Sequence, residues 1–365
     1  EGRLTRRPAL LAETNWDLLV IDEAHEGVDT IKTDLAFDQI TRARTLHLSG
    51  TPFKALASGQ FQQDQIYNWT YEDEQVARLD WPDDGEENPY GDLPTLNLLT
   101  YQISRMVTDR LAEGVASAED EANLDYTFDL SQFFATKENG FFEHGAEVIK
   151  FLDSMTPNEK SPSSPPERRE EVRHSFWLLN RVASAKALER LLKKHEVFKE
   201  YEVILAAGDG KRDNDTDPVA VGKSFDRVRS AIDEAETRDG RTITLSVGQL
   251  TMGVTVPEWT AVIMLSNLSS PAQYMQAAFR AQNPCTFERS GQVYQKQNAY
   301  IFDFAPERTL TIFDAFANNL HPNPSGDQQT RQDNIRTRLS FSPVVREGSE
   351  GRMIELDASQ VLTFP

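Results

Sequence analysis

Residues 18–27 read LLVIDEAHEG, an apolar run that stops abruptly at two carboxylates and a histidine. Consecutive large aliphatic residues are typical of a strand that is buried on both faces of a parallel sheet. An ordinary strand that runs into an acidic turn is the simpler interpretation. The residues further along the chain decide between the two.

Further short apolar runs alternate with helical patterns, which predicts parallel strands joined by crossover helices. Residues 155–170 are rich in Pro and Ser and predict a linker or exposed loop. Beyond them, five strands fit a doubly wound domain over residues 170 to about 315. The fold class is therefore α/β with parallel sheets. The predicted strands lie at 17–22, 45–50, 95–103, 175–180, 202–208, 242–247, 261–266 and 299–304.

The composition is that of an ordinary globular protein with two domains. The chain has 365 residues, of which 39% are hydrophobic and 26% are charged. A formal net charge of −20 excludes a basic coat for nucleic acid, although it allows a few local phosphate contacts. No apolar run reaches the roughly 18 residues that span a bilayer, so no membrane partner is expected. The single cysteine, Cys285, cannot form an internal disulfide and favours a reducing, cytoplasmic location.

The acidic end of the first run suits phosphoryl transfer. At the carboxyl end of a parallel strand, Asp22 can reach a magnesium ion held by nucleotide phosphates. The next residue, Glu23, can orient or deprotonate the attacking water. A zinc site is excluded for His25, because no H-E-x-x-H spacing occurs in the chain.

A second strand ends in small hydroxyl residues at 46–53, which read LHLSGTPF. There Ser49 and Thr51 can bond both the acids of the first run and a facing domain, and so transmit the state of a nucleotide. An ordinary turn is the alternative interpretation.

Residues 245–265 read LSVGQLTMGVTVPEWTAVIML, with a glycine-containing loop after a strand. Such a loop lets the backbone come close to a phosphate or a nucleic-acid strand. The candidate contact residues are Thr251, Gly253 and Thr255. An ordinary connection between two strands is the alternative.

Residues 267–284 read NLSSPAQYMQAAFRAQNP and predict a helix that begins at Ser270 and Pro271. In that helix Gln273, Gln276 and Arg280 share one face. An arginine on such a face can stabilise the charge that develops on a γ-phosphate. A solvated polar face is the alternative.

These four segments, in this order and spacing, resemble the motor motifs of superfamily 2 helicases and translocases. DEAH (22–25) matches motif II, SGTP (49–52) motif III, TMGVTVP (251–257) motif V and QAAFRAQ (276–282) motif VI. Within the superfamily, the acidic and aromatic run after SGTPF and the segment YIFDFAPERTL (300–310) resemble the motor subunits of type III and related restriction systems.

The resemblance implies two RecA-like domains with ATP in the cleft between them and a nucleic-acid strand across their top. In the first domain it implies that Asp22 helps to hold Mg²⁺ and that Glu23 is the catalytic base. It further implies that His25 couples hydrolysis to the second domain, and that Ser49 and Thr51 relay this coupling.

In the second domain, the resemblance implies that Thr251, Gly253 and Thr255 contact nucleic acid or ribose. It implies that Gln276 and Arg280 reach the phosphates of ATP. The expected partners are DNA and other restriction-modification subunits or domains, such as a nuclease and a methyltransferase.

Two features depart from the family pattern. Asn283 stands where motif VI usually has a second arginine, so Arg280 must act alone or with Arg181 or Arg289. The phosphate-binding G-x-x-x-x-G-K-[ST] motif is absent from the 365 residues, so this chain alone is expected to bind ATP poorly and hydrolyse it slowly or not at all.

We therefore interpret the chain, which begins without Met, as a fragment of a larger motor whose first RecA-like domain is incomplete at its amino terminus. Residues 1–105 are expected to form the end of RecA-like domain 1, and residues 106–170 an acidic insertion and linker. Residues 171–315 are expected to form RecA-like domain 2, followed by a polar extension at 316–365.

Two alternatives to a DNA motor stay open. A non-catalytic nucleic-acid-binding or interaction module with a degenerate RecA fold is favoured by Asn283 and by the missing phosphate loop, whereas the intact Asp22, Glu23 and His25 disfavour it. An RNA helicase would carry the same motor motifs.

Overall fold

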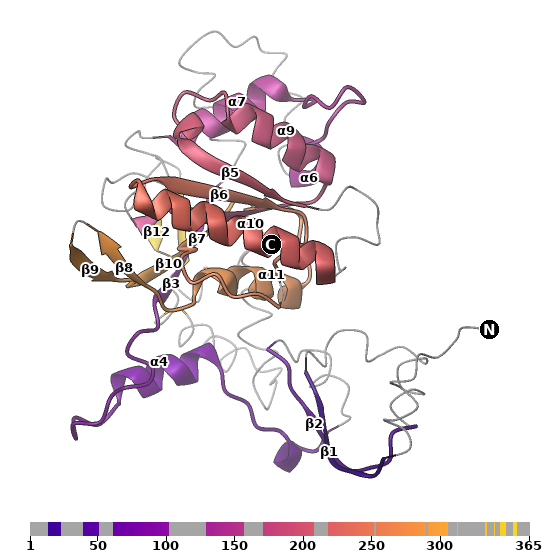
Figure 1. Ribbon diagram of the computed structural model, residues 1–365, viewed down its shortest axis with the longest axis vertical. Helices are drawn as coiled ribbons and strands as arrows, with labels where there is room; N and C mark the ends of the chain where they lie inside the picture. Colours follow the sequence, from indigo (N-terminus) through magenta and orange to yellow (C-terminus); the bar gives the residue numbers. More distant parts are fainter. Residues whose placement is uncertain are drawn as a thin grey trace. The chain divides into compact units, whose positions relative to one another are not determined.

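The chain divides into two compact units in a computed structural model (Figure 1). The first unit holds Glu1–Asn68 and Asn319–Pro324, and the second holds Trp69–Asn318 and Ser325–Pro365. The structure describes residues 14–22, 39–50, 61–101, 129–156, 171–207, 218–251, 253–289 and 291–305, with short pieces at 312, 333, 339, 344–347 and 353–355.

The first unit contains a small parallel sheet. Strands β1 (Trp16–Ile21) and β2 (Arg42–His47) pair in parallel, and a short 3-10 helix, η1 (Gln63–Gln65), comes after them. Strand β1 begins one residue before the predicted 17–22, and β2 begins three residues before the predicted 45–50 and ends at His47. Their burial differs from the prediction, because the side chains of Leu18 and Val20 are 48% and 49% exposed. Within the described part of this unit, no α-helix and no third strand covers the sheet.

The second unit is built on an eight-stranded sheet with the order β12-β11-β3-β10-β7-β4-β6-β5. All neighbouring strands run parallel except β12, which is antiparallel to β11. The five strands predicted after residue 170 are confirmed as the five neighbours β10 to β5. The strands are β3 (Thr95–Thr100), β4 (His174–Leu179), β5 (Tyr201–Ala206), β6 (Arg241–Ser246), β7 (Ala261–Leu265), β10 (Asn298–Asp303), β11 (Val344–Glu347) and β12 (Met353–Glu355).

The strand predicted at 95–103 belongs to the second unit, although we expected it in the first domain. It is β3, and it pairs with β10 from Thr95 to Thr100. The helix before it, α4 (Tyr71–Leu79), lies with it, because the backbone N–H of Leu96 donates to the Tyr71 hydroxyl at 3.1 Å. The two units therefore divide between Asn68 and Trp69 rather than near residue 105. The physical reason is that the apolar β3 completes its hydrogen bonds beside a strand about two hundred positions later in the sequence.

Residues 129–156, the described part of 106–170, form a folded layer. The acidic residues 116–125 and the predicted linker beyond residue 156 lie outside the described residues. Helices α6 (Leu130–Phe133) and α7 (Gly145–Ser154) lie in it. Phe133 and Phe151 are fully buried in the hydrophobic core that also contains residues of the sheet. Phe133 and Phe151 therefore serve packing, whereas Phe141 is exposed.

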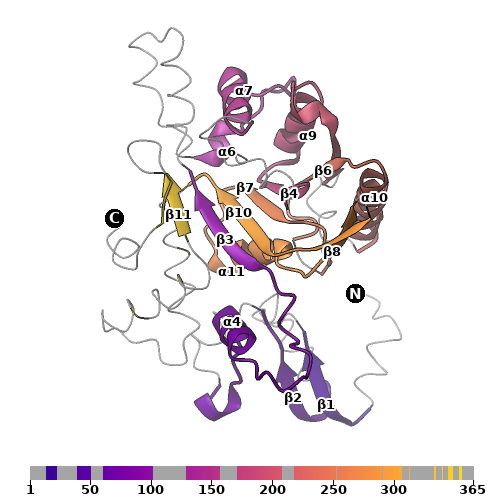
Figure 2. The ribbon, with the colours of Figure 1, turned by 90° about the vertical axis from the view of Figure 1, so that its left-hand side faces the viewer.

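Helices cover both faces of the second sheet, as Figures 1 and 2 show. Helices α6, α7 and α9 (Val182–Leu192) lie on one face, with Leu188 packed in the same cluster as Trp177. Helices α10 (Pro218–Thr237) and α11 (Pro271–Ala278) lie on the other face. The Phe176 ring packs on Trp259 with the ring centroids 4.7 Å apart. This arrangement explains why β4 is buried along its whole length.

The described part of the second unit also contains two 3-10 helices and a hairpin. The 3-10 helices are η3 (Phe198–Glu200) and η4 (Phe279–Ala281), of which η4 continues directly from α11. The antiparallel hairpin consists of β8 (Thr286–Arg289) and β9 (Gln292–Gln295). The hairpin lies between η4 and β10 in the sequence.

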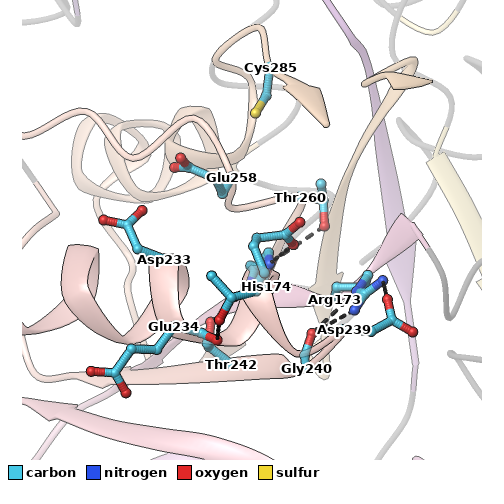
Figure 3. Close-up of polar contacts among 12 residues, drawn as sticks. Arg173, His174, Asp233, Glu234, Asp239, Gly240, Thr242, Glu258, Thr260 and Cys285 are labelled. Carbon is cyan, nitrogen blue, oxygen red and sulfur yellow. Dashed lines mark hydrogen bonds and ion pairs between the residues drawn. The ribbon is translucent and has the colours of Figure 1, made fainter. Parts of the chain in front are cut away.

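Buried polar residues fix the end of α10 to the amino ends of β4 and β6 (Figure 3). The Arg173 guanidinium pairs with Asp239 at 2.5 Å and donates to the Gly240 carbonyl at 2.9 Å. The His174 ring lies 2.9 Å from the Thr242 hydroxyl and 2.6 Å from the Glu236 carboxylate. Arg173, His174 and Thr242 are buried, whereas Asp239 is exposed. Because the buried groups are paired, their burial is compatible with a stable core.

Among the described residues, no helix combines the length and the apolar character that a membrane span requires.

Candidate functional site

The predicted site residues of the first unit lie at the carboxyl ends of β1 and β2. Asp22 comes directly after β1 and is exposed, and Ser49 lies two positions beyond β2. The backbone N–H of Leu48 donates to the Ile21 carbonyl at 2.8 Å, which holds the two strand ends side by side. Glu23, His25 and Thr51 lie outside the described residues.

The other predicted residues lie in the second unit, on two segments that contact each other. One segment is the connection between β6 and β7, residues 247–260, called here the β6–β7 loop. Its described residues contain no helix. It begins at the carboxyl end of β6 and ends at the amino end of β7, so it returns across the sheet in an irregular conformation.

Left-handed backbone conformations shape the start of this loop. Gly248 has φ = +94° and Gly253 has φ = +70°, values that residues with a side chain adopt at a cost. A Cβ atom at Gly253 would meet nothing within 4 Å, so backbone conformation rather than space requires glycine there. Leu250 also has φ = +63°, and its burial against the core holds it in this conformation.

Side chains fasten the loop at its origin. The Ser224 hydroxyl donates to the Gln249 amide oxygen at 2.9 Å, and the Ser246 hydroxyl donates to the Gln249 carbonyl. The Thr251 hydroxyl donates to the Gly248 carbonyl at 2.6 Å. Thr251 therefore stabilises the turn itself, while Thr255 is exposed further along. A rigid turn with accessible backbone is suited to close contact with a phosphate.

The second segment is α11 together with η4. Helix α11 begins as predicted, with Ser270 as the N-cap residue and Pro271 in the first turn. The backbone N–H of Gln273 donates to the Ser270 hydroxyl at 3.5 Å. Tyr274 and Met275 are buried, so the helix packs on the sheet with one face. Gln276 lies on a half-buried part of the helix.

Arg280 joins the two segments. Its guanidinium donates to the Val254 carbonyl of the β6–β7 loop, and its Nε donates to the Gln276 carbonyl at 3.2 Å. Because Arg280 is half-buried, these bonds are partly shielded from water. The sequence motifs that contain Thr251, Gly253 and Arg280 thus meet in space.

Asn283, the departure from motif VI, caps the end of η4. Its side-chain amide donates to the Arg280 carbonyl at 3.2 Å. Asn283 therefore holds the backbone of Arg280. Of the two arginines named as substitutes, Arg181 is exposed at the start of α9, and Arg289 lies in β8.

The sequence did not predict the role of Lys296. This side chain is only 4% exposed, and its ammonium group donates to three backbone carbonyls near the site. Burial lowers the pKa of Lys296 to about 7. A single lysine in the run QKQN has no pattern that distinguishes it from a solvated lysine.

The neighbouring residue Cys285 carries a half-buried thiol. Burial, with the negative charge of Glu258 as a smaller cause, raises the pKa of Cys285 to about 11. Within the described ranges, no group of three or more His, Cys, Asp or Glu side chains is arranged to hold a metal ion.

Comparison with known proteins finds one informative relative in sequence. No protein-family model matches the chain. The chain is 24% identical over 377 aligned residues to a Mycoplasma pneumoniae (strain ATCC 29342 / M129 / Subtype 1) protein named "Putative type II restriction enzyme and methyltransferase RM.MpnORF110P C-terminus". The match covers 87% of this chain and 50% of the relative, so the chain spans about half the relative's length. The predicted resemblance to restriction-modification proteins is supported at this level.

The solved structures that match the chain are more distant in sequence. The ATP-dependent Type ISP restriction-modification enzyme LlaBIII bound to DNA has 15% identity and a TM-score of 0.43, and covers 90% of this chain and 20% of its own. The Mycobacterium smegmatis helicase Lhr bound to ssDNA and AMP-PNP has 11% identity and a TM-score of 0.40. That match covers 91% of this chain and 37% of the Lhr chain. Neither likeness establishes the fold or function of this chain, whose α/β class is confirmed by its own parallel sheet.

Proposed function

We propose that the chain is part of an ATP-dependent nucleic-acid translocase or helicase motor of a restriction-modification system, with DNA as the track. The contact that supports this most is the bond from Arg280 to the Val254 carbonyl. It joins the segment that resembles motif VI to the segment that resembles motif V. The sequence relative, whose name contains a restriction enzyme and a methyltransferase, supports the restriction-modification setting.

In this proposal the second unit contacts both nucleic acid and the phosphates of ATP. Thr251, Gly253 and Thr255 contact the nucleic-acid backbone or a ribose, because the loop presents accessible backbone in left-handed turns. Arg280 stabilises charge on the γ-phosphate, and Gln276 lies one helical turn before it.

The first unit contributes acids. Asp22 is an exposed carboxylate at a strand's carboxyl end, which fits a ligand of nucleotide-bound Mg²⁺. When bound, the metal neutralises phosphate charge. Glu23 then holds the attacking water and accepts its proton, and His25, Ser49 and Thr51 transmit the change. A type III-like arrangement with separate nuclease and methyltransferase parts belongs to the same proposal.

The phosphate-binding loop is the missing part of this site. No G-x-x-x-x-G-K-[ST] motif occurs in the 365 residues. We therefore propose that these residues alone hydrolyse ATP slowly or not at all, and that full activity requires a loop from elsewhere in the complete protein.

The function is tested by steady-state ATP hydrolysis of the full-length protein. In the Glu23→Gln variant, DNA-stimulated turnover should fall by roughly 10²- to 10⁴-fold, because general-base catalysis contributes about that much. Glu196→Gln is the control, since Glu196 is an exposed residue after α9. Unchanged turnover in Glu23→Gln rejects Glu23 as the base.

The two alternatives give different results in the same assay. If the protein binds nucleic acid but hydrolyses no ATP with any nucleic acid, the chain belongs to a non-catalytic module. The presence of Asn283 in place of the arginine expected from motif VI favours this alternative. If RNA stimulates hydrolysis and duplex or single-stranded DNA does not, the substrate assignment changes to RNA.

A further inference from the structure

Lys296 lies outside the four motor segments, and its side chain is turned into the protein. It lies between β9 and β10, and its backbone N–H donates to the Cys285 carbonyl at 2.9 Å. This bond extends the β8–β9 hairpin by one step. The hairpin therefore holds the lysine backbone in place and directs its side chain away from solvent.

The ammonium group of Lys296 makes three hydrogen bonds to main-chain carbonyls. The acceptors are Pro257 at 2.9 Å, Trp259 at 2.7 Å and Asn283 at 2.8 Å. Below its pKa of about 7, Lys296 is protonated and has three N–H donors and no acceptor, so the three carbonyls use its full capacity. Above that pKa the neutral amine keeps two donors. Two acceptors belong to the β6–β7 loop and the third lies just beyond η4.

The same two segments are already joined by Arg280. Its guanidinium bonds the Val254 carbonyl, and its own carbonyl accepts from the Asn283 side chain at 3.2 Å. A continuous chain of hydrogen bonds therefore leaves the loop at Val254 and returns to it at Pro257. It passes through Arg280, Asn283 and Lys296. The side chains of Arg280 and Lys296 thus bond three carbonyls of the loop, those of Val254, Pro257 and Trp259.

The charged and ionisable groups near Lys296 are not the acceptors of its hydrogen bonds. Glu258 points to Arg229, to which it is bonded at 2.5 Å, and Cys285 carries a neutral thiol near neutral pH. The carbonyl contacts are the direct bonds of the ammonium group. Removing the group would leave three shielded carbonyls without their donor, which weakens the attachment.

We propose that Lys296 is a positioning residue that ties the β6–β7 loop to the end of η4, so that the loop's nucleic-acid contacts and the Arg280 guanidinium keep a fixed geometry. This inference rests on the proposed function for its catalytic consequence. The tie itself is a property of the fold and can be measured without ATP hydrolysis.

The first measurement is hydrogen exchange of backbone amides in the full-length protein below pH 7, where Lys296 is protonated, compared between wild type and Lys296→Met. Methionine keeps the length and apolar stem of lysine but donates no hydrogen bond. Exchange in peptides covering 246–260 and 279–285 should rise by roughly 10-fold or more, a local opening effect, while strands β4 and β5 keep their protection. Unchanged exchange in both peptides overturns the tie.

Two further variants serve as a control and as a replacement for Lys296→Met. Lys193→Met is the control, because the Lys193 side chain is 54% exposed and bonds only Glu189 at 2.7 Å among the residues described. If Lys296→Met does not fold, Lys296→Gln carries the test, since its amide keeps two donors and should give an intermediate rise in exchange.

The second measurement is steady-state ATP hydrolysis with saturating duplex DNA. In Lys296→Met, kcat should fall by roughly 10- to 100-fold with the KM for ATP within about twofold, because a misplaced arginine loses transition-state contact rather than substrate binding. Lys296→Gln should recover part of kcat. An unchanged kcat in a variant with raised exchange overturns the positioning role.

The two hypotheses fail in different ways. If wild-type protein hydrolyses no ATP with any nucleic acid, the proposed function fails, and the exchange result still decides the tie. If wild-type protein is active and Lys296→Met raises KM with kcat unchanged, the lysine acts on substrate binding and the positioning role is wrong.

Discussion

The two parallel sheets of this protein contain similar apolar strands, but these strands differ sharply in how deeply they are buried. In the second unit, every residue of β4 is buried between helices on both faces. In the first unit, only Ile21 of β1 is buried, although β1 is also an apolar run that ends at functional candidates. The difference shows that an apolar run specifies a strand, whereas burial depends on which elements pack against that strand.

The largest expected effect is a difference between two leucines. Leu188 is 0% exposed in α9, and Leu18 is 48% exposed in β1. Leu188→Ala should lower the free energy of unfolding by about 2–5 kcal/mol, because it leaves a cavity in the core. Leu18→Ala should change it by less than ~0.5 kcal/mol. Urea unfolding measures both, and equal effects would show that the small sheet is buried as deeply as the large one.

The second expected effect is a pH dependence of the free energy of unfolding that comes from Lys296 in the second unit. Burial lowers the pKa of Lys296 from 10.5 to about 7, so between these pH values the unfolded chain binds more protons than the folded chain. The contribution of Lys296 to the free energy of unfolding therefore rises with pH, by up to about 1.4 kcal/mol per pH unit. Comparing wild type with Lys296→Met from pH 7 to 9 by urea unfolding isolates this slope.

Above pH 9 a second group acts with the opposite sign. The pKa of Cys285 is raised from 9.0 to about 11, so the folded chain binds more protons than the unfolded chain in that interval. The rise should flatten there, and Cys285→Ser should restore it. A slope that is the same in wild type and Lys296→Met would contradict the assignment to Lys296.

A smaller effect on the free energy of unfolding is expected at the amino-terminal ends of β4 and β6. Thr242→Val keeps the side-chain shape but removes the hydroxyl that lies 2.9 Å from the His174 ring. The variant should lose about 1–2 kcal/mol of unfolding free energy, since it leaves a buried ring nitrogen without that partner. Thr45→Val in the exposed β2 is the matched substitution and should cost less. Thermal denaturation compares the two.

The smallest effect is expected at the start of α11. Ser270→Ala removes the N-cap hydroxyl, whose bond to the Gln273 N–H is long at 3.5 Å. The loss should be about 0.5–1 kcal/mol, at the lower end for an N-cap. Ser270→Asp should keep most of the stability, because aspartate also caps helices. A larger loss from Ser270→Asp than from Ser270→Ala would contradict the capping role.

Local patterns predicted which segments are strands and where α11 begins. The five strands after residue 170 and the N-cap at Ser270 are specified by apolar runs and by one turn of helix. The placement of β3 could not be predicted in this way, because its partner β10 lies far along the chain and pairing at that distance leaves no local pattern. The sequence therefore predicted what β3 is, but not which sheet it joins.

The candidate site divides in the same way. Motif order predicted that Thr251, Gly253 and Arg280 belong to one site, and the structure adds the bond from Arg280 to Val254. Lys296 could not be found from sequence, because its role comes from three carbonyls that any residue type supplies. The catalytic and contact roles of all these residues stay predictions, as do those of Asp22 and Ser49 in the first unit.

The most direct test of the proposed motor compares ATP hydrolysis by the full-length wild type and its Arg280→Ala variant, each with and without duplex DNA. We expect DNA to stimulate the wild type. We also expect the variant to lose roughly 10³-fold or more of the stimulated rate, as is usual for an arginine that stabilises phosphoryl transfer. Equal DNA-stimulated rates in the two proteins would contradict the proposed motor.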